Sequence, residues 1–106
     1  MKLEVGMYVR TDDGYIYRVY KVREDNIRVK GTFLLGEELT IFNNEIVKTS
    51  NNIIDLIEVG EYVNGFPVIH KENDILECGL LVQFKENDIK SILTREQFSA
   101  MEYKID

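Results

Sequence analysis

The sequence predicts a mostly β protein made of two small tandem units packed together, residues 1–50 and 51–106, with one short helix near the C-terminus. The first observation is an internal repeat. Residues 3–9 (LEVGMYV) return as residues 57–63 (IEVGEYV), fifty-four positions later, with five of seven residues identical. This spacing is about half of the 106-residue chain, so it indicates two units of similar size. The second observation is that short runs of β-branched and aromatic residues alternate with turn residues in both units.

The predicted strands of the first unit (residues 1–50) are short and end at residues that favour turns. Asp12-Asp13-Gly14 favours a hairpin because glycine readily takes the positive φ that such turns need. Asn26 tolerates left-handed geometry at the next turn. Apolar and charged residues alternate from residue 27, which predicts a half-buried strand, and Gly31 is expected to mark a bulge or a sharp bend. The strands are expected at residues 7–11, 15–23, 27–35, 39–42 and 45–48.

The junction and the second unit (residues 51–106) follow the same plan. Ser50, Asn51 or Asn52 is expected to cap one helical turn that docks apolar residues onto a core, and no flexible linker follows. Asn64-Gly65 is a strong hairpin signal. Thr94 and Gln97 form a capping box that opens a helix through about residue 101. The strands are expected at residues 62–63, 66–71, 75–78, 80–85, 89–93 and, closing the unit, 102–105.

Four to five short strands joined by short turns predict a small barrel in each unit. A strand, one helical turn and a closing strand at the end of a unit resemble an SH3-like barrel. The opening Val-Gly-x-Tyr-Val at residues 5–9 and 59–63, before a glycine turn and a hairpin, resembles KOW- and Tudor-type members of that group. Residues 52–65 and 91–104 resemble small proteins encoded by phages and prophages of low-GC Gram-positive bacteria. The resemblances imply one SH3-like barrel per unit and a bacterial host cell as the setting, but no activity.

Composition places the chain among soluble globular proteins, because 44% of its residues are hydrophobic and 30% are charged. No apolar run approaches the ~18 residues that cross a bilayer, and the N-terminus turns acidic at Glu4, unlike a signal peptide. A single cysteine, Cys78, excludes an internal disulfide and suits a reducing compartment. The expected location is therefore the cytoplasm of a bacterial host cell.

Enzymatic activity is not expected, because the sequence carries no catalytic or metal-binding motif and calls for no cofactor. A metal site needs three or four ligands, whereas His70 and Cys78 are the single histidine and cysteine. A nucleophilic pair of these two residues is conceivable on adjacent strands, but Cys78 lies in an apolar strand where a buried thiol is the commoner outcome.

Charge is distributed unevenly between the two units. Residues 1–50 carry eight acidic and eight basic residues, whereas residues 51–106 carry eleven and five, so the net charge of −6 falls on the second unit. This acidity argues against general binding of duplex nucleic acid and favours a partner protein with a basic surface. The alternative is that the acidic residues only confer solubility. The candidate contact residues are Glu58, Glu61, Glu72 and Glu77.

Tyrosines and basic residues are interleaved in the first unit. Aromatic and arginine side chains on a sheet can stack bases and neutralise phosphates, which indicates a site for a small anionic nucleotide. If residues 15–23 pair with residues 27–32, the side chains of Arg18, Tyr20, Arg28 and Lys30 converge on one face. The alternative is a solvated exterior whose long side chains cover apolar surface. The candidate binding residues are Tyr17, Arg18, Tyr20, Arg28 and Lys30.

These observations together predict a non-enzymatic binding protein, and homo-oligomers are compatible with them. The phage-like resemblance makes a host protein or a host-defence component the first expected target, reached through surface contacts or charge mimicry. The alternative is a protein that sequesters a nucleotide signal on the tyrosine- and arginine-rich face of the first unit. A further alternative is a structural or assembly component of a virion. Fold analogy does not choose among these functions.

Overall fold

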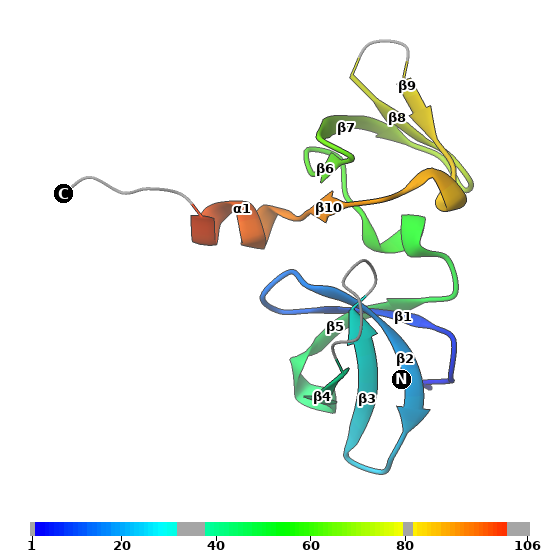
Figure 1. Ribbon diagram of the computed structural model, residues 1–106, viewed down its shortest axis with the longest axis vertical. Helices are drawn as coiled ribbons and strands as arrows, with labels where there is room; N and C mark the ends of the chain where they lie inside the picture. Colours follow the sequence, from blue (N-terminus) through cyan, green and yellow to red (C-terminus); the bar gives the residue numbers. More distant parts are fainter. Residues whose placement is uncertain (1, 32–37, 80–81, 102–106) are drawn as a thin grey trace, which may run out of the picture.

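The computed structural model describes residues 2–31, 38–79 and 82–101, which form two antiparallel five-stranded sheets followed by one short α-helix (Figure 1). The mostly β fold with one helix near the C-terminus is therefore confirmed. Residues 32–37 and 80–81, which the sequence assigned to strands and a turn, and the predicted closing strand at 102–105 lie outside the described residues.

The first sheet has the strand order β4-β3-β2-β1-β5. Its strands are β1 (Tyr8–Thr11), β2 (Ile16–Val22), β3 (Asn26–Gly31), β4 (Glu38–Phe42) and β5 (Ile46–Ser50). A short 3-10 turn, η1 (Asn43–Glu45), precedes β5, and the Glu45 carboxylate accepts a hydrogen bond from the Phe42 amide at its start. The register between β2 and β3 shifts at Tyr20, and Gly31, where a bulge or a sharp bend is predicted, pairs with Tyr17 as the last described residue of β3.

The second sheet has the order β10-β6-β7-β8-β9, which is the order of the first sheet read from the other edge. Its strands are β6 (Tyr62–Val63), β7 (Phe66–Lys71), β8 (Leu76–Cys78), β9 (Val82–Phe84) and β10 (Ile92–Leu93). A 3-10 turn, η3 (Glu86–Asp88), again precedes the last strand. Asn64 and Gly65 both take positive φ, 53° and 84°, as the two-residue hairpin predicted there requires.

The two copies of the repeated segment occupy matching surroundings. Gly6 and Gly60 have φ of 94° and 96°, and their amides donate to the carbonyls of Val19 and Val68 at 2.8 and 2.9 Å. In the first sheet the register of β2 with β3 shifts at the residue after Val19, and in the second sheet the register of β7 with β8 shifts at the residue after Val68. These shared contacts give a residue-by-residue correspondence between the two sheets.

Each sheet buries its own apolar cluster. The first is built on Val9, Val19, Ile27, Val29, Ile41 and Ile46. The second is built on Val63, Val68, Leu76, Cys78 and Ile89, together with isoleucines of the junction, and Tyr8 and Ile16 of the first sheet pack against it. The two units are thus joined by apolar packing as well as by the chain.

The junction is a single 3-10 turn, η2 (Ile53–Leu56), which lies between the two sheets (Figure 1). Asn52 caps it, because its side-chain oxygen accepts a hydrogen bond from the Ile54 amide at 3.0 Å. Ile53, Ile54 and Leu56 are all buried. The predicted cap and docking of this turn are therefore confirmed.

The helix α1 (Arg95–Met101) begins at the predicted capping box. The Thr94 amide donates to the Gln97 side chain at 3.0 Å, and the Gln97 amide reaches the Thr94 hydroxyl at 3.5 Å. Phe98 stacks on Tyr62 of β6 with ring centroids 6.1 Å apart, which holds the helix against the second sheet.

Val9→Ala and Val63→Ala should each lower the free energy of unfolding by roughly 1–3 kcal/mol, because both side chains are fully buried and truncation leaves a cavity. The repeat supplies matched controls in Val5 and Val59, which are 66% and 51% exposed. Their alanine variants should stay within about 0.5 kcal/mol of the wild type. Urea unfolding of the four variants makes the comparison, and equal effects at buried and exposed valines would contradict it.

Candidate functional site

One outer face of the first sheet gathers the basic residues that the sequence singled out. Four residues on neighbouring strands lie side by side in the sheet register, in the order Tyr8, Arg18, Lys30 and Glu38. Two positions along β3 from Lys30, Arg28 lies beside Thr40 of β4. Cross-strand neighbours share a face of the sheet. We call Arg18, Tyr20, Arg28 and Lys30 the cationic face.

Contacts within the cationic face hold its side chains close together. Arg28 donates from Nε to the Tyr20 hydroxyl at 3.1 Å and from a terminal nitrogen to the Thr40 hydroxyl at 2.8 Å. The Lys30 ammonium lies 5.3 Å from the centre of the Tyr20 ring, and the Arg18 guanidinium 5.7 Å from that of Tyr8. These are cation–π distances. Hydrogen bonding to Tyr20 raises the pKa of Arg28, which stays charged.

The predicted convergence of Arg18, Tyr20, Arg28 and Lys30 agrees with these contacts and with the pairing of β2 and β3. Tyr17 departs from the prediction. It packs against the buried cluster of the first sheet and stacks on Tyr15 with ring centroids 6.0 Å apart. Adjacent residues of a strand point to opposite faces, so Tyr17 lies away from the cationic face.

The second sheet carries no comparable face at the corresponding positions, all of which are described. Tyr62 pairs with Pro67 where Tyr8 pairs with Arg18, and His70 pairs with Glu77 where Lys21 pairs with Arg28. The residues that correspond to the cationic face are Pro67, Ile69, Glu77 and Gly79. Two similar sheets therefore differ in the charge of the same face, so the strand arrangement itself does not require the basic residues.

The four acidic candidates of the second unit do not form one exposed surface. Glu58 pairs with Arg95 at 3.3 Å, and Glu72 lies 3.4 Å from His70 near the end of β7. Glu77 is half-buried in β8. Glu61 is 1% exposed, so the prediction of a surface charge there is wrong: an arginine of the first unit covers it.

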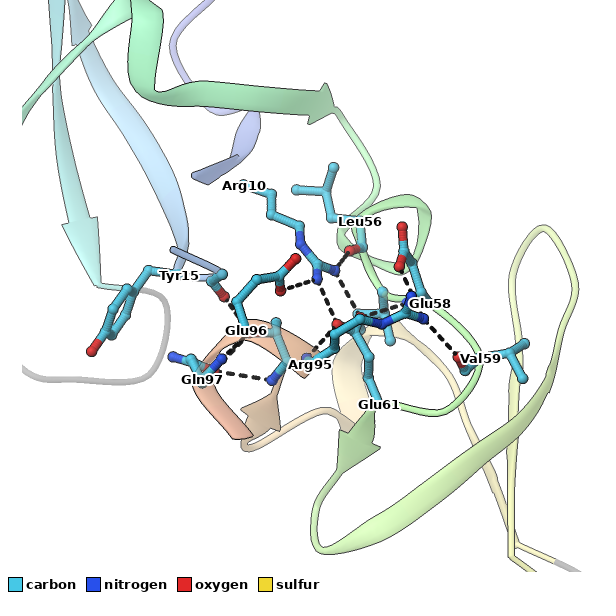
Figure 2. A network of polar contacts seen from close by, with 12 residues as sticks. Arg10, Tyr15, Leu56, Glu58, Val59, Glu61, Arg95, Glu96 and Gln97 are labelled. Atoms are coloured by element: carbon cyan, nitrogen blue, oxygen red, sulfur yellow. Dashed lines mark hydrogen bonds and ion pairs between the residues drawn. The ribbon is translucent and has the colours of Figure 1, made fainter. Parts of the chain in front are cut away.

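Glu61 instead belongs to a buried polar network between the two units (Figure 2). Arg10 of β1 donates to both Glu61 carboxylate oxygens, at 2.7 and 2.5 Å, and to the Leu56 carbonyl at 2.6 Å. The second terminal nitrogen of Arg10 also reaches Glu96 of α1 at 2.6 Å. This network, which we call the junction network, joins β1, the junction turn, the residue just before β6 and the helix.

Each charge of the junction network is matched by partners. Burial alone would raise the pKa of Glu61, but hydrogen bonds from Arg10 and from the amides of Arg95 and Glu58 outweigh it and hold that pKa below its usual value. Burial likewise disfavours the charged form of Arg10, yet its hydrogen bonds to Glu61 and Glu96 raise its pKa. Both groups are therefore charged at neutral pH.

A second contact ties the first hairpin to the start of the helix. The buried Thr94 hydroxyl donates to the Gly14 carbonyl at 2.7 Å. Gly14 has φ of 86°, and a side-chain carbon there would overlap the Thr94 hydroxyl. Glycine is thus needed at this position both for the turn and for the close approach of the two units.

The repeat contains the signal that would have revealed the junction network. The pattern LEVGMYV/IEVGEYV differs in character at one position, where Met7 of the first copy corresponds to Glu61 of the second. The residue after the pattern also differs, Arg10 against Asn64. Positions where two copies of one fold diverge are candidates for contacts that only one copy makes.

The remaining candidates do not form a reactive site. Cys78 is fully buried, and burial raises the pKa of its thiol, while His70 is exposed and pairs with Glu77 in the register. Among the described residues no group of three or more His, Cys, Asp or Glu side chains is placed to hold a metal ion. No helix in the described part of the chain has the length and apolar character to cross a membrane.

Comparison of the chain with protein-family models, curated proteins and solved structures finds no match.

Proposed function

We propose that this chain is a non-enzymatic binding protein whose first sheet binds a small nucleotide on the cationic face. The carrying observation is that Arg28 and Lys30 contact Tyr20 and Arg18 lies beside Lys30 on the same face, while the corresponding face of the second sheet has Glu77 in place of Arg28. A solvated exterior that serves only the fold would not need this difference between two similar sheets.

The side chains of this face suit the two parts of a nucleotide. Arginine offers paired N–H donors that match phosphate oxygens, and lysine adds a compact positive charge. Tyrosine rings and guanidinium planes stack on bases. Tyr20 lies beside Lys30, so ring and charge occur together there, while Tyr8 lies beside Arg18 and also packs against the apolar cluster of the second unit.

A compact ligand fits better than a long nucleic acid. The chain has a net charge of −6, and a polyanion that extends beyond the face would meet this excess of negative charge. A small ligand that spans only the cationic face meets the single carboxylate of Glu38, which Arg28 and Lys30 offset. This supports a mononucleotide or a short nucleotide signal, in keeping with the phage-like resemblance, which would place the ligand in a bacterial host cell.

We also propose that each unit is an SH3-like barrel. Support comes from five short strands in the same order in both sheets and from a 3-10 turn before the last strand of each. Barrels of this kind often bind through their loops and exposed faces rather than in deep clefts. The cationic face, formed by β2 and β3 beside Tyr8 of β1, is such an open surface.

A basic protein partner for the second unit ranks below the nucleotide. Of its four proposed contact residues, Glu61 is buried by Arg10 and Glu58 is engaged by Arg95. Glu72 and Glu77 remain as acidic contacts. Two separate carboxylates provide a weaker basis for electrostatic steering than one face on which three cations outnumber the single carboxylate of Glu38.

The test is thermal unfolding of the full chain with ADP, with adenosine and with pyrophosphate. ADP should raise Tm by several degrees in a concentration-dependent way, because a ligand that binds only the folded state stabilises it. Adenosine lacks the phosphates and pyrophosphate lacks the base, so each should act more weakly than ADP. Absence of any shift with ADP at millimolar concentration would overturn the proposal.

A further inference from the structure

An acidic residue already occupies the centre of the cationic face. Glu38 begins β4 and lies beside Lys30 in the register. Its carboxylate accepts a hydrogen bond from the Tyr20 hydroxyl at 3.0 Å. The same carboxylate lies 3.6 Å from a terminal nitrogen of Arg28 and 3.9 Å from the Lys30 ammonium.

Three different donor groups thus converge on one anionic group. A hydroxyl, a guanidinium and an ammonium around a common point form a donor set suited to a phosphate. The Glu38 side chain is 45% exposed and those of Arg28 and Lys30 are 30% and 56% exposed, so incoming ligand can reach the donors. The carboxylate marks the point at which the donors meet.

We propose that Glu38 occupies the phosphate subsite of the cationic face and competes with the ligand for it. This inference rests on the proposed nucleotide binding and names its regulation. A ligand phosphate must displace the Glu38 carboxylate from Tyr20, Arg28 and Lys30. The Arg18 guanidinium lies over the ring of Tyr8 in β1. Arg18 takes no part in the contacts with Glu38 and is available to bind the rest of the ligand.

The competition also sets ligand specificity. A terminal phosphate carries nearly two charges at neutral pH and three acceptor oxygens, whereas a carboxylate carries one charge and two oxygens. A carboxylate ligand would therefore gain little by replacing Glu38. A phosphate gains charge and hydrogen bonds, so the site should select phosphorylated ligands over carboxylic acids.

The experiment measures ADP binding by calorimetry for the wild type, Glu38→Gln and Glu72→Gln at low ionic strength. Glu38→Gln should bind ADP about two- to fivefold more tightly, in keeping with the removal of one exposed ion-pair competitor. The gain should shrink with added salt, because these charges are exposed to solvent. Glu72→Gln makes the same change in net charge in the second unit and should leave the affinity nearly unchanged.

Two outcomes would overturn the inference in distinguishable ways. If the wild type binds ADP and Glu38→Gln binds equally or more weakly, Glu38 positions Arg28 instead of competing, and nucleotide binding itself stands. If neither protein binds ADP, the proposed function fails together with the inference. Equal tightening by Glu38→Gln and Glu72→Gln would show a general charge effect and also reject the subsite.

Discussion

Arg10→Met should lower the free energy of unfolding by about 3–5 kcal/mol, the usual cost of leaving one partner of a buried ion pair without the other. Arg10 and Glu61 have side chains that are 4% and 0% exposed, and Arg10 donates to both Glu61 oxygens. Methionine keeps much of the arginine volume, so the loss comes from the uncompensated charge. Urea unfolding at pH 7 measures it.

Further variants separate the buried pair from charge in general. Arg10→Met combined with Glu61→Met should recover part of the loss, because both charges are removed and methionine is the residue that the first copy of the repeat has at the position of Glu61. Glu58→Gln disrupts the exposed pair with Arg95 and should cost less than about 1 kcal/mol. A cost for Arg10→Met no larger than that of Glu58→Gln would contradict the prediction.

Acid should weaken the same network. The pKa of Glu61 in the folded state lies below its ordinary value of 4.5. The contribution of ionised Glu61 to the free energy of unfolding is therefore fully present above pH 4.5 and is lost as pH falls through the folded pKa. In Arg10→Met the buried Glu61 lacks its partner, and burial then raises its pKa. The difference in stability between the wild type and this variant should therefore narrow as pH falls, beginning where Glu61 of the variant takes up its proton and ending where the wild-type Glu61, whose pKa is lower, is protonated as well.

Arg28→Ala should weaken ADP binding by about 10- to 100-fold, because hydrogen bonds to charged groups contribute roughly 1.5–3 kcal/mol. Arg28 is the best-anchored cation of the face, held by Tyr20 and Thr40. Arg18→Ala should also reduce affinity, and by less, since Arg18 contacts the ring of Tyr8 and lies outside the group around Glu38. Calorimetry with ADP provides both values.

Lys90→Ala is the matched control, because Lys90 is an exposed cation of the second unit and its removal makes the same change in net charge. Its affinity for ADP should equal that of the wild type. All three variants should keep the wild-type Tm within a few degrees, since none of these side chains is buried. Equal weakening by Arg28→Ala and Lys90→Ala would show that only net charge matters and would reject the cationic face as a site.

Local signals in the sequence predicted the local structure well. Asn64-Gly65 makes its hairpin, Asn52 caps the junction turn and Thr94 opens the helix because each depends on residues at most a few positions away. The alternation of β2 and β3 likewise brought Arg18, Arg28 and Lys30 to one face. The prediction placed Tyr17 on the same face as its neighbour Arg18. Adjacent residues of a strand point to opposite faces, and Tyr17 points toward the core.

Contacts between the two units were not predictable in the same way. Arg10 and Glu61 are fifty-one positions apart, and Arg10 and Glu96 eighty-six. Neither acid has a local feature that distinguishes it from the exposed carboxylates of the turns. Burial of Glu61 follows from how the two sheets meet, and Glu61 therefore looked like one more surface charge. The position of Glu38 among the basic residues also depends on the pairing of β3 with β4, whereas the predicted strands at residues 27–35 and 39–42 left Glu38 out.

The junction network makes the union of the two copies directional. The first copy contributes Arg10 to the joint, and the second contributes Glu61. At the position of Glu61 the first copy has Met7, so it lacks the acid that a preceding copy would need. At the position of Arg10 the second copy has Asn64, so it lacks the arginine that a following copy would need. Neither outer end of the pair can therefore form the same joint again. A duplicated module that kept identical surfaces could add to itself without limit into an open-ended filament. Here divergence at two positions leaves neither outer surface with the groups of the Arg10–Glu61 pair.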